Sequence, residues 1–178
     1  MTPHLFIRFS LLCILSLAGF VPVKSAESPA AAVANDNNPA RSEMALVEAA
    51  RQKIKQDRDT EADAVLDGES QAKQKNARSV VLARRTATVC GWLRNEDDFG
   101  RAKKLAGRTI DRLAKLSESS TEDRVERCYW EAWLEGEILD HKQRAVDLLK
   151  AGEKLAPDDK RLSEARVRWT AALERFQK

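Results

Sequence analysis

The sequence predicts an all-α protein built from antiparallel helical hairpins. After residue 42, apolar residues follow the helical period almost throughout the chain. Glycine and proline are scarce in the same region, and the alternation of β-branched residues that is typical of strands does not occur. The loops between the predicted helices are short, and short loops make consecutive helices antiparallel.

Residues 1–26 have the pattern of a secretory signal peptide. Arg8 lies in a short polar start, an apolar run follows from Phe9 to Val23, and Ser25 and Ala26 are small residues suited to cleavage. The apolar run is shorter than the roughly 20 residues that a membrane span needs. We therefore expect a periplasmic or secreted bacterial protein with no stable membrane insertion after cleavage near Ser25-Ala26. An uncleaved membrane anchor is the alternative.

Residues 27–41 have the composition of a disordered linker. They contain two prolines and three asparagines and show no amphipathic period. The helical domain is therefore expected to span residues 42–178, a length that suits one domain.

The charge balance argues against a nucleic-acid partner. The chain has 31 Lys and Arg against 28 Asp and Glu, and loss of Arg8 and Lys24 with the signal leaves 29 basic residues. A nucleic-acid binder usually keeps a large basic surplus. The nearly neutral mature chain has none.

Three helices are expected in the first half of the domain. Ser42 is the expected cap of the first, and Thr60 the expected cap of the second. The third spans about residues 77–94. Its apolar side is formed by Leu82, Thr86, Val89 and Leu93.

Four helices are expected in the second half. Asp97 or Asp98 caps a helix over residues 99–116, and the next spans residues 121–139. For the helix over residues 121–139, Ser119 with Glu122 or Ser120 with Asp123 fits a capping box. The remaining two helices begin with Asp140 as a cap and with Pro157 as a first helical residue.

The hairpin at residues 126–159 resembles a tetratricopeptide repeat. Tyr129 supplies an early aromatic, Ala145 and Leu149 form the spaced pair of the second helix, and Pro157 closes the unit. The match departs from the family at two positions: Trp133 stands where the family has a small glycine, and Gly136 stands where it has a large tyrosine. The preceding unit, with Ala102, Ala106 and Thr86, matches weakly.

The resemblance implies a short right-handed superhelix of stacked hairpins, with residues 158–176 as a C-terminal capping helix. An ordinary irregular helical bundle is the alternative.

Two cysteines remain once Cys13 leaves with the signal. Cys90 and Cys128 are then expected to form a disulfide, because disulfides persist in exported proteins. Such a bridge would stabilise the domain by roughly 4 kcal/mol. Two buried free thiols in neighbouring helices are the alternative.

The sequence does not predict an enzyme, a cofactor or a metal site. His141 is the only histidine after residue 26, and the chain has neither a phosphate-binding loop nor a CxxC pair. An exported cell-wall glycan enzyme is the less favoured alternative. It would use paired carboxylates such as Glu131 with Glu135, or Glu122 with Glu126.

The resemblance implies a scaffold that binds a protein or peptide partner in the cell envelope. In that family the first helices of the repeats line the binding groove, and arginines beside an aromatic suit a peptide with an acidic group. Packing of Trp130 in the core is an alternative that the sequence leaves open, as is a nonspecific chaperone of envelope proteins. The groove residues transferred from the family pattern are Arg84, Arg94, Arg127, Trp130, Leu134 and Glu137.

A second basic feature runs along one predicted helix. Its side chains recur at helical spacing and are expected to form a solvated face. They are Arg101, Lys104, Arg108, Arg112 and Lys115.

Overall fold

The computed structural model describes residues 39–68, 77–118 and 120–176, and these residues form helices and turns without a strand. The all-α prediction is therefore confirmed for them. The predicted signal peptide and the linker up to residue 38 lie outside the described residues. The helices are α1 (Pro39–Lys55), α2 (Asp59–Asp67), α3 (Arg78–Asn95), α4 (Phe99–Leu113), α5 (Thr121–Trp133), the π-helix η1 (Leu134–Ile138), α6 (Lys142–Leu155) and α7 (Lys160–Phe176).

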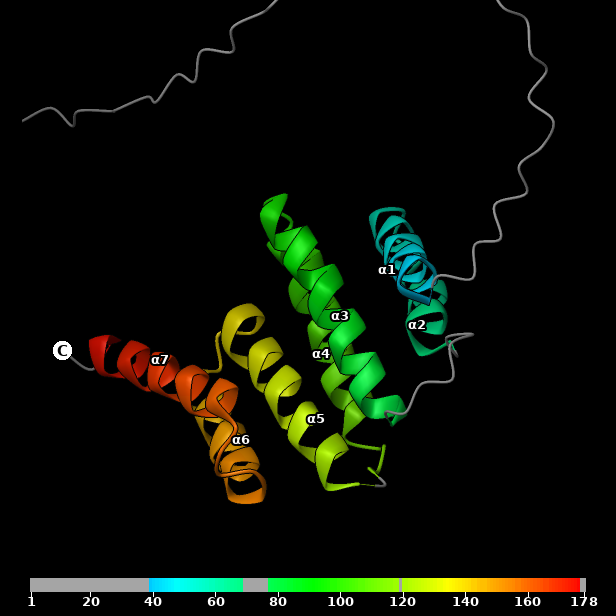
Figure 1. Ribbon diagram of the computed structural model, residues 1–178. Helices are drawn as coiled ribbons and strands as arrows, with labels where there is room; N and C mark the ends of the chain where they lie inside the picture. Colours follow the sequence, from blue (N-terminus) through cyan, green and yellow to red (C-terminus); the bar gives the residue numbers. More distant parts are fainter. Residues whose placement is uncertain (1–38, 69–76, 119, 177–178) are drawn as a thin grey trace, which may run out of the picture. The chain divides into compact units, whose positions relative to one another are not determined.

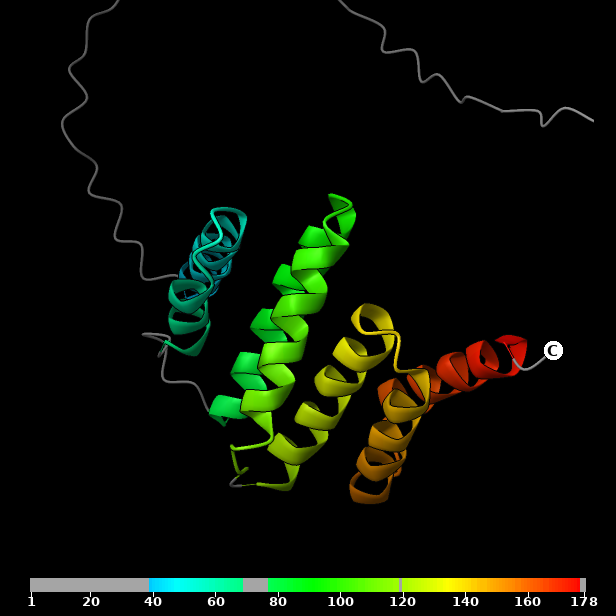
Figure 2. The ribbon, with the colours of Figure 1, turned by 180° about the vertical axis from the view of Figure 1, so that it is seen from behind.

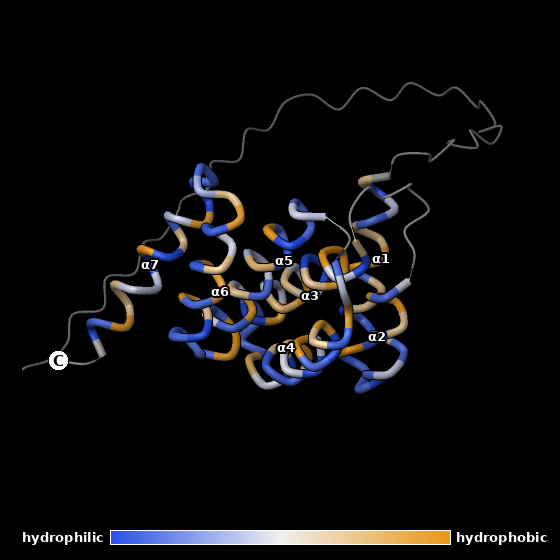
Figure 3. The backbone as a smooth tube through the Cα atoms, turned by 90° about the horizontal axis from the view of Figure 1, so that it is seen from below, coloured by the Kyte–Doolittle hydropathy of each residue, from blue (hydrophilic) through white to orange (hydrophobic). Residues whose placement is uncertain are grey.

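Consecutive helices pack as hairpins, and the hairpins pack against one another through their first helices. α1 contacts α2, α3 contacts α4, and α5 contacts α6, while α3 also contacts both α1 and α5. In Figure 1, α1, α3 and α7 lie in front of α2, α4 and α6, and Figure 2 shows the reverse order. Figure 3 shows hydrophobic and hydrophilic stretches alternating along the helices, as expected for helices that bury one side.

The first three hairpins turn in the same way. Each turn has an aspartate in the left-handed region: Asp57 with φ 56°, Asp97 with φ 61° and Asp140 with φ 64°. Aspartate is one of the few non-glycine residues that adopt this conformation readily. The prediction that Asp140 caps α6 is wrong, because His141 is the N-cap residue of α6 and Asp140 lies in the turn before it.

The three hairpins also share buried positions counted from these aspartates. The residue five positions later is a fully or almost fully buried alanine, and the residue four positions beyond it is also buried. The pairs are Ala62 with Leu66, Ala102 with Ala106, and Ala145 with Leu149. The small alanine at the first of these positions allows the two helices of a hairpin to approach closely.

Two of the predicted helix caps are confirmed. The Asp98 carboxylate accepts a hydrogen bond from the Arg101 backbone N–H at 3.3 Å, and the Ser120 hydroxyl accepts one from the Asp123 backbone N–H at 3.0 Å. These side chains occupy the position where a helix start leaves backbone donors unpaired.

Three other helix starts differ from the prediction. α1 begins at Pro39, so Ser42 lies inside it, and α2 begins at Asp59, so Thr60 does as well. α7 begins at Lys160 rather than at Pro157, and Asp159 accepts a hydrogen bond from the Arg161 backbone N–H at 3.0 Å. A proline or hydroxyl residue near a boundary therefore located these helices only to within a few residues.

The helix predicted for residues 121–139 changes type part of the way along. Its last turn is η1, in which the Leu139 N–H donates to the Leu134 carbonyl at 3.0 Å, five residues back. At the centre of η1, the ring of Trp169 from α7 packs so closely that a Cβ added to Gly136 would lie 2.7 Å from it. π-turns of this kind are uncommon and are often found at functional positions.

Two hydrophobic clusters hold the helices together. The first contains residues of α1, α2, α3, α4 and η1, among them Leu82, Leu105 and Leu134. The second joins α5, α6 and α7 around Leu149 and Trp169. Leu134 of η1 belongs to the first cluster and Gly136 of η1 packs against Trp169 of the second, so η1 connects the two. None of the described helices is both long and apolar enough to cross a membrane.

A buried arginine links the first three helices. The Arg85 side chain is 1% exposed and forms two bonds of 2.8 Å to the carboxylate of Glu43 in α1. It also donates to the carbonyls of Leu66 at 2.9 Å and Gly68 at 2.5 Å, where α2 ends. Arg85 thus satisfies carbonyl groups that a helix end leaves without backbone partners.

The predicted solvated basic face of α4 is instead paired with an acidic face of α2. Arg108 bonds to Asp59 and Asp63 at 3.0 Å, Lys104 bonds to Asp59 at 2.6 Å, and Arg112 bonds to Asp67 at 2.5 Å. The acids and the bases recur every four residues on their helices, so they meet in register.

This ladder predicts a stability that depends on salt. We expect Arg108→Ala to lower the free energy of unfolding by about 1 kcal/mol, because both of its ion pairs are only partly exposed. This loss of stability should be smaller in high salt, because salt already weakens the Arg108 ion pairs in the parent protein. Urea denaturation at two salt concentrations measures it. Lys150→Ala, which removes a 4.0 Å pair with Asp147 on α6, is the control and should change little in either condition.

The predicted disulfide is not present, and both cysteines are free thiols. Cys90 is fully buried and its thiol donates to the Ala102 carbonyl of α4 at 3.4 Å. Cys128 instead packs towards α6, where a Cβ added to Gly152 would lie 3.2 Å from the Cys128 Cβ. The two side chains are directed at different partner helices, and a disulfide needs their Cβ atoms close together.

The Cys90 thiol should be unreactive in the native protein. Burial raises the pKa of the Cys90 thiol to about 12, and burial is also the main cause that raises the pKa of Cys128. Because the thiolate is the reactive form, we expect iodoacetamide to leave Cys90 unmodified in the native protein at pH 8 and to modify it after unfolding. Peptide mass spectrometry reads each site separately. Rapid native labelling of Cys90, or recovery of a Cys90–Cys128 linked peptide, would contradict this packing.

Candidate functional site

The six predicted groove residues lie on α3, α5 and η1, which are neighbouring elements. Arg84 and Arg94 come from α3, Arg127 and Trp130 from α5, and Leu134 and Glu137 from η1. The structure brings one pair of them into direct contact, since Arg94 bonds to Glu137 at 2.6 Å. Arg84 and Arg127 pair with other acids, and Trp130 packs against the hydrophobic cluster that contains Leu134.

Arg127 belongs to the framework of the fold. Its side chain is 17% exposed, and it donates to Glu131 at 3.0 Å and to the Leu116 carbonyl at 3.0 Å. It also forms an ion pair with Glu118. With three acceptors, this guanidinium ties the segment after α4 to α5. Its predicted role as an open groove residue is therefore not supported by its surroundings.

Leu134 is also misplaced by the family pattern. It is fully buried in the first hydrophobic cluster. Trp130 is half-buried, packs against the same cluster and meets the edge of the Tyr129 ring at a centroid distance of 5.2 Å. A large part of Trp130 thus serves packing, and the remainder is accessible to solvent.

The Arg84 side chain is more exposed than that of Arg127, but it also lies close to an acidic residue. Its guanidinium lies 3.6 Å from Glu43 and its side chain is 37% exposed. Glu43 is shared with Arg85, and the hydrogen bond from Arg85 is the main cause that lowers the pKa of the Glu43 carboxyl, in opposition to burial. Glu43 therefore anchors α1 to α3 through both arginines.

Glu137 is the centre of a cluster that sequence reasoning identified only in part. Besides Arg94 of α3, it faces Arg168 of α7 at 3.4 Å. The Arg168 guanidinium also lies over the Trp169 ring, 5.1 Å from its centroid. We call Arg94, Glu137 and Arg168 the arginine clasp. Arg168 was missed because no local signal connects an exposed arginine of the last helix with a glutamate two helices earlier.

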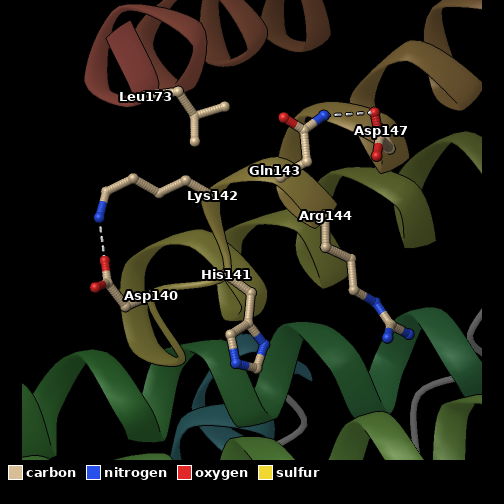
Figure 4. A pocket seen from close by; sticks show the side chains of 7 residues that line it. All are labelled: Asp140, His141, Lys142, Gln143, Arg144, Asp147 and Leu173. Atoms are coloured by element: carbon tan, nitrogen blue, oxygen red, sulfur yellow. Dashed lines mark hydrogen bonds and ion pairs between the residues drawn. The ribbon is translucent and has the colours of Figure 1, made fainter. Parts of the chain in front are cut away.

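A pocket of about 620 Å³ opens where η1 turns into α6 (Figure 4). Two of its lining residues share a buried acid: the carboxylate of Glu135, only 1% exposed, bonds to His141 Nδ1 at 2.8 Å and to Arg144 Nε at 2.7 Å. Several lining side chains bond to each other, including Lys142 with Asp140 and Gln143 with Asp147. The seven lining residues are Asp140, His141, Lys142, Gln143, Arg144, Asp147 and Leu173.

Both glutamates of the paired-carboxylate hypothesis bond to basic side chains. Glu135 has His141 and Arg144, and Glu131 has Arg127 at 3.0 Å. The paired-glutamate hypothesis needs one carboxyl group that stays protonated as an acid. Two glutamates fixed in ion pairs are poorly suited to that role. Among the described residues, no group of three or more His, Cys, Asp or Glu side chains is placed to hold a metal ion.

Comparison with known proteins assigns no family to the chain. No family model, no curated protein and no solved structure matches it. The resemblance of residues 126–159 to a tetratricopeptide repeat therefore stays a prediction, and the interpretation of the site depends on its geometry.

Proposed function

We propose that this chain is an exported interaction module that binds a protein or peptide partner in the bacterial cell envelope, by binding alone and without catalysis. The observation that carries the proposal is the packing of α1, α3 and α5, the first helices of three successive hairpins, against one another. Side-by-side helices of this kind form an extended, preorganised surface, which lowers the entropic cost of binding a partner segment.

The repeated turns support the resemblance to tetratricopeptide proteins. Asp57, Asp97 and Asp140 occupy the same left-handed position, and each is followed five residues later by a buried alanine. Repeats need neighbours to bury their faces, and three successive units meet that need. A right-handed superhelix with α7 as its terminal cap is part of this proposal.

The odd-numbered helices are the proposed binding surface. The α2–α4 side is occupied by the ladder of ion pairs, in which Arg108 alone contacts two aspartates. On α3 and α7, Arg94 is 42% exposed and Arg168 is 59% exposed, so both can reach a partner. Trp130 on α5 adds a half-buried aromatic. Arginine and tryptophan are enriched among the residues that contribute most to protein interfaces.

The exposed apolar residues favour a selective partner over a general chaperone. A chaperone that covers apolar segments needs a contiguous apolar surface of its own. The large exposed hydrophobic residues of the described chain lie on three different helices: Met44 on α1, Phe99 on α4 and Val167 on α7. Single exposed residues of this kind are normal for a soluble surface.

Site-specific photocrosslinking in intact cells tests the proposal. A photoreactive amino acid at Arg84 on α3, which lies outside the pair of exposed arginines Arg94 and Arg168, should give a discrete adduct that excess unmodified protein suppresses. The same amino acid at Lys150 or Lys154, exposed on α6, serves as the matched control and should give none. Equal adducts from α3 and α6 would contradict the assigned surface, and a smear of many weak adducts would favour the chaperone.

A further inference from the structure

The arginine clasp joins three elements that are distant in the sequence. Glu137 of η1 receives Arg94 Nη1 at 2.6 Å and Arg168 Nη2 at 3.4 Å. Both guanidiniums are substantially exposed, whereas the Glu137 side chain is only 20% exposed. The acid thus lies deeper than the two bases, and the bases form the outer rim of the cluster.

The clasp has more donors and more positive charge than Glu137 can use. Two guanidiniums face one carboxylate, which leaves one positive charge in excess. Each guanidinium has five N–H donors, while a carboxylate offers acceptor sites on only two oxygens. The Arg168 guanidinium carbon lies over the Trp169 ring, 5.1 Å from its centroid. A guanidinium held against an aromatic ring loses less entropy when it forms a new bond.

The other predicted groove arginines do not offer this combination. Arg127 is 17% exposed and has three acceptors, and Arg84 shares Glu43 with the buried Arg85. Arg94 and Arg168 differ from these two arginines because both are exposed and together they carry one more positive charge than the Glu137 carboxylate balances.

We propose that the arginine clasp binds the carboxylate of an aspartate or glutamate side chain in the partner, and that Glu137 competes with this carboxylate as an internal ligand. The inference rests on the proposed function and specifies the chemistry of its partner. Planar guanidiniums match a carboxylate through two parallel hydrogen bonds. A single surplus charge suits one carboxylate, whereas a nucleic-acid backbone requires many basic contacts.

Internal competition has a consequence that a purely structural ion pair does not have. In Glu137→Gln the two arginines lose their charged partner and should bind an external carboxylate more tightly. If Glu137 served only to hold α3 and α7 together, the same change would weaken binding or leave it unchanged. The direction of the Glu137→Gln effect therefore separates the two roles.

Fluorescence anisotropy with defined probes tests the inference. The first probe is a fluorescein-labelled, C-terminally amidated octapeptide of alternating Glu and Ala, and the second replaces each Glu with Gln. At low salt we expect the Glu peptide to bind at least about tenfold more tightly than the Gln peptide. Arg94→Gln and Arg168→Gln should each remove most of that difference, and Glu137→Gln should enlarge it. Arg175→Gln, a change at an exposed arginine of α7 outside the clasp, is the control and should leave it intact.

Several outcomes would overturn the inference. One is equal binding of the two peptides, and another is weaker or unchanged binding of the Glu peptide to Glu137→Gln. A third is equally tight binding of a Gln peptide with a free C-terminus, which would assign the site to chain ends. Each variant's melting temperature is measured alongside, so that a folding defect is recognised. If photocrosslinking from α3 succeeds while the Glu and Gln peptides bind alike, the proposed function stands and this inference fails.

Discussion

Replacing Arg85 with alanine is expected to lower the free energy of unfolding by about 3 kcal/mol, the lower end of the range for breaking a buried ion pair. The Arg85 side chain is 1% exposed and has three acceptor groups: the Glu43 carboxylate and the carbonyls of Leu66 and Gly68. Alanine leaves a partly buried carboxylate without its main partner and removes the donor that closes the end of α2. A buried acceptor that loses its donor costs its full desolvation.

Arg84 provides a matched control for this prediction. It is the preceding residue of α3 and faces the same Glu43, but at 3.6 Å and with its side chain 37% exposed. Arg84→Ala should therefore cost less than about 1 kcal/mol. Urea denaturation followed by circular dichroism measures both changes. Hydrogen exchange should show the Arg85→Ala loss first in α1 and α2, and similar losses for the two variants would contradict the assigned role of Arg85.

Acid should act on the same contact. The Arg85 hydrogen bond is the largest cause that holds the pKa of Glu43 below its usual 4.5. A carboxyl group with a lowered folded pKa stabilises the fold above its ordinary pKa, and this contribution is lost as the pH falls through the folded value. Glu43→Gln should therefore flatten the fall of stability below about pH 4.5 relative to the parent protein. An unchanged acid dependence would show that other carboxylates dominate it.

The helices were predictable because their signals are local. The apolar residues of α4 recur at the helical period, and both Asp98 and Ser120 precede a helix start where a side-chain acceptor is needed. The turns were less predictable. Aspartate is favoured both as a cap and in the left-handed conformation, so the sequence alone did not separate these roles at Asp140.

The long-range ion pairs were not predictable from one sequence. Arg85 has the same residue type and nearly the same sequence context as Arg84, yet only Arg85 is buried. The basic face of α4 was interpreted as solvated because its acidic partners lie on α2, more than 40 residues away. The arginine clasp was predicted only in part for the same reason: the repeat pattern indicated Arg94 and Glu137 but not Arg168. Helical periodicity shows which side of a helix is polar, but it does not show what that side contacts.

The cysteines show a related limit. Their number and the predicted compartment favoured a disulfide, but a disulfide also requires two side chains to point at each other. The rotation of α3 directs Cys90 at α4, and the rotation of α5 directs Cys128 at α6. Rotation about a helix axis is set by packing of the whole hairpin, which two residues in a sequence do not reveal.

The substitution Gly136→Ala is expected to destabilise the protein by about 2 kcal/mol, although alanine is ordinarily the better helix former. An added Cβ would lie 2.7 Å from the Cε2 and Cζ2 atoms of Trp169 and 3.1 Å from its Cδ2. Trp169 is 6% exposed and belongs to the second hydrophobic cluster, so its ring can move only by disturbing α7.

Gly107→Ala is the opposite case in the same chain. No atom lies within 4 Å of a Cβ added to Gly107 in the middle of α4, so only the helix preference acts. We expect this variant to gain up to about 1 kcal/mol. The two substitutions are chemically identical and should change the free energy of unfolding in opposite directions.

A double-mutant cycle with Trp169→Leu tests whether the tryptophan ring is the cause. Trp169→Leu alone should cost a few kcal/mol, about as much as other losses of large core side chains. In that background Gly136→Ala should cost far less than in the parent protein, because the ring atoms that the new methyl group meets are gone. This coupling should be at least about 1 kcal/mol. Additive effects, or a Gly136→Ala variant as stable as Gly107→Ala, would show that η1 tolerates a larger residue and that the contact between η1 and α7 does not fix the last helix.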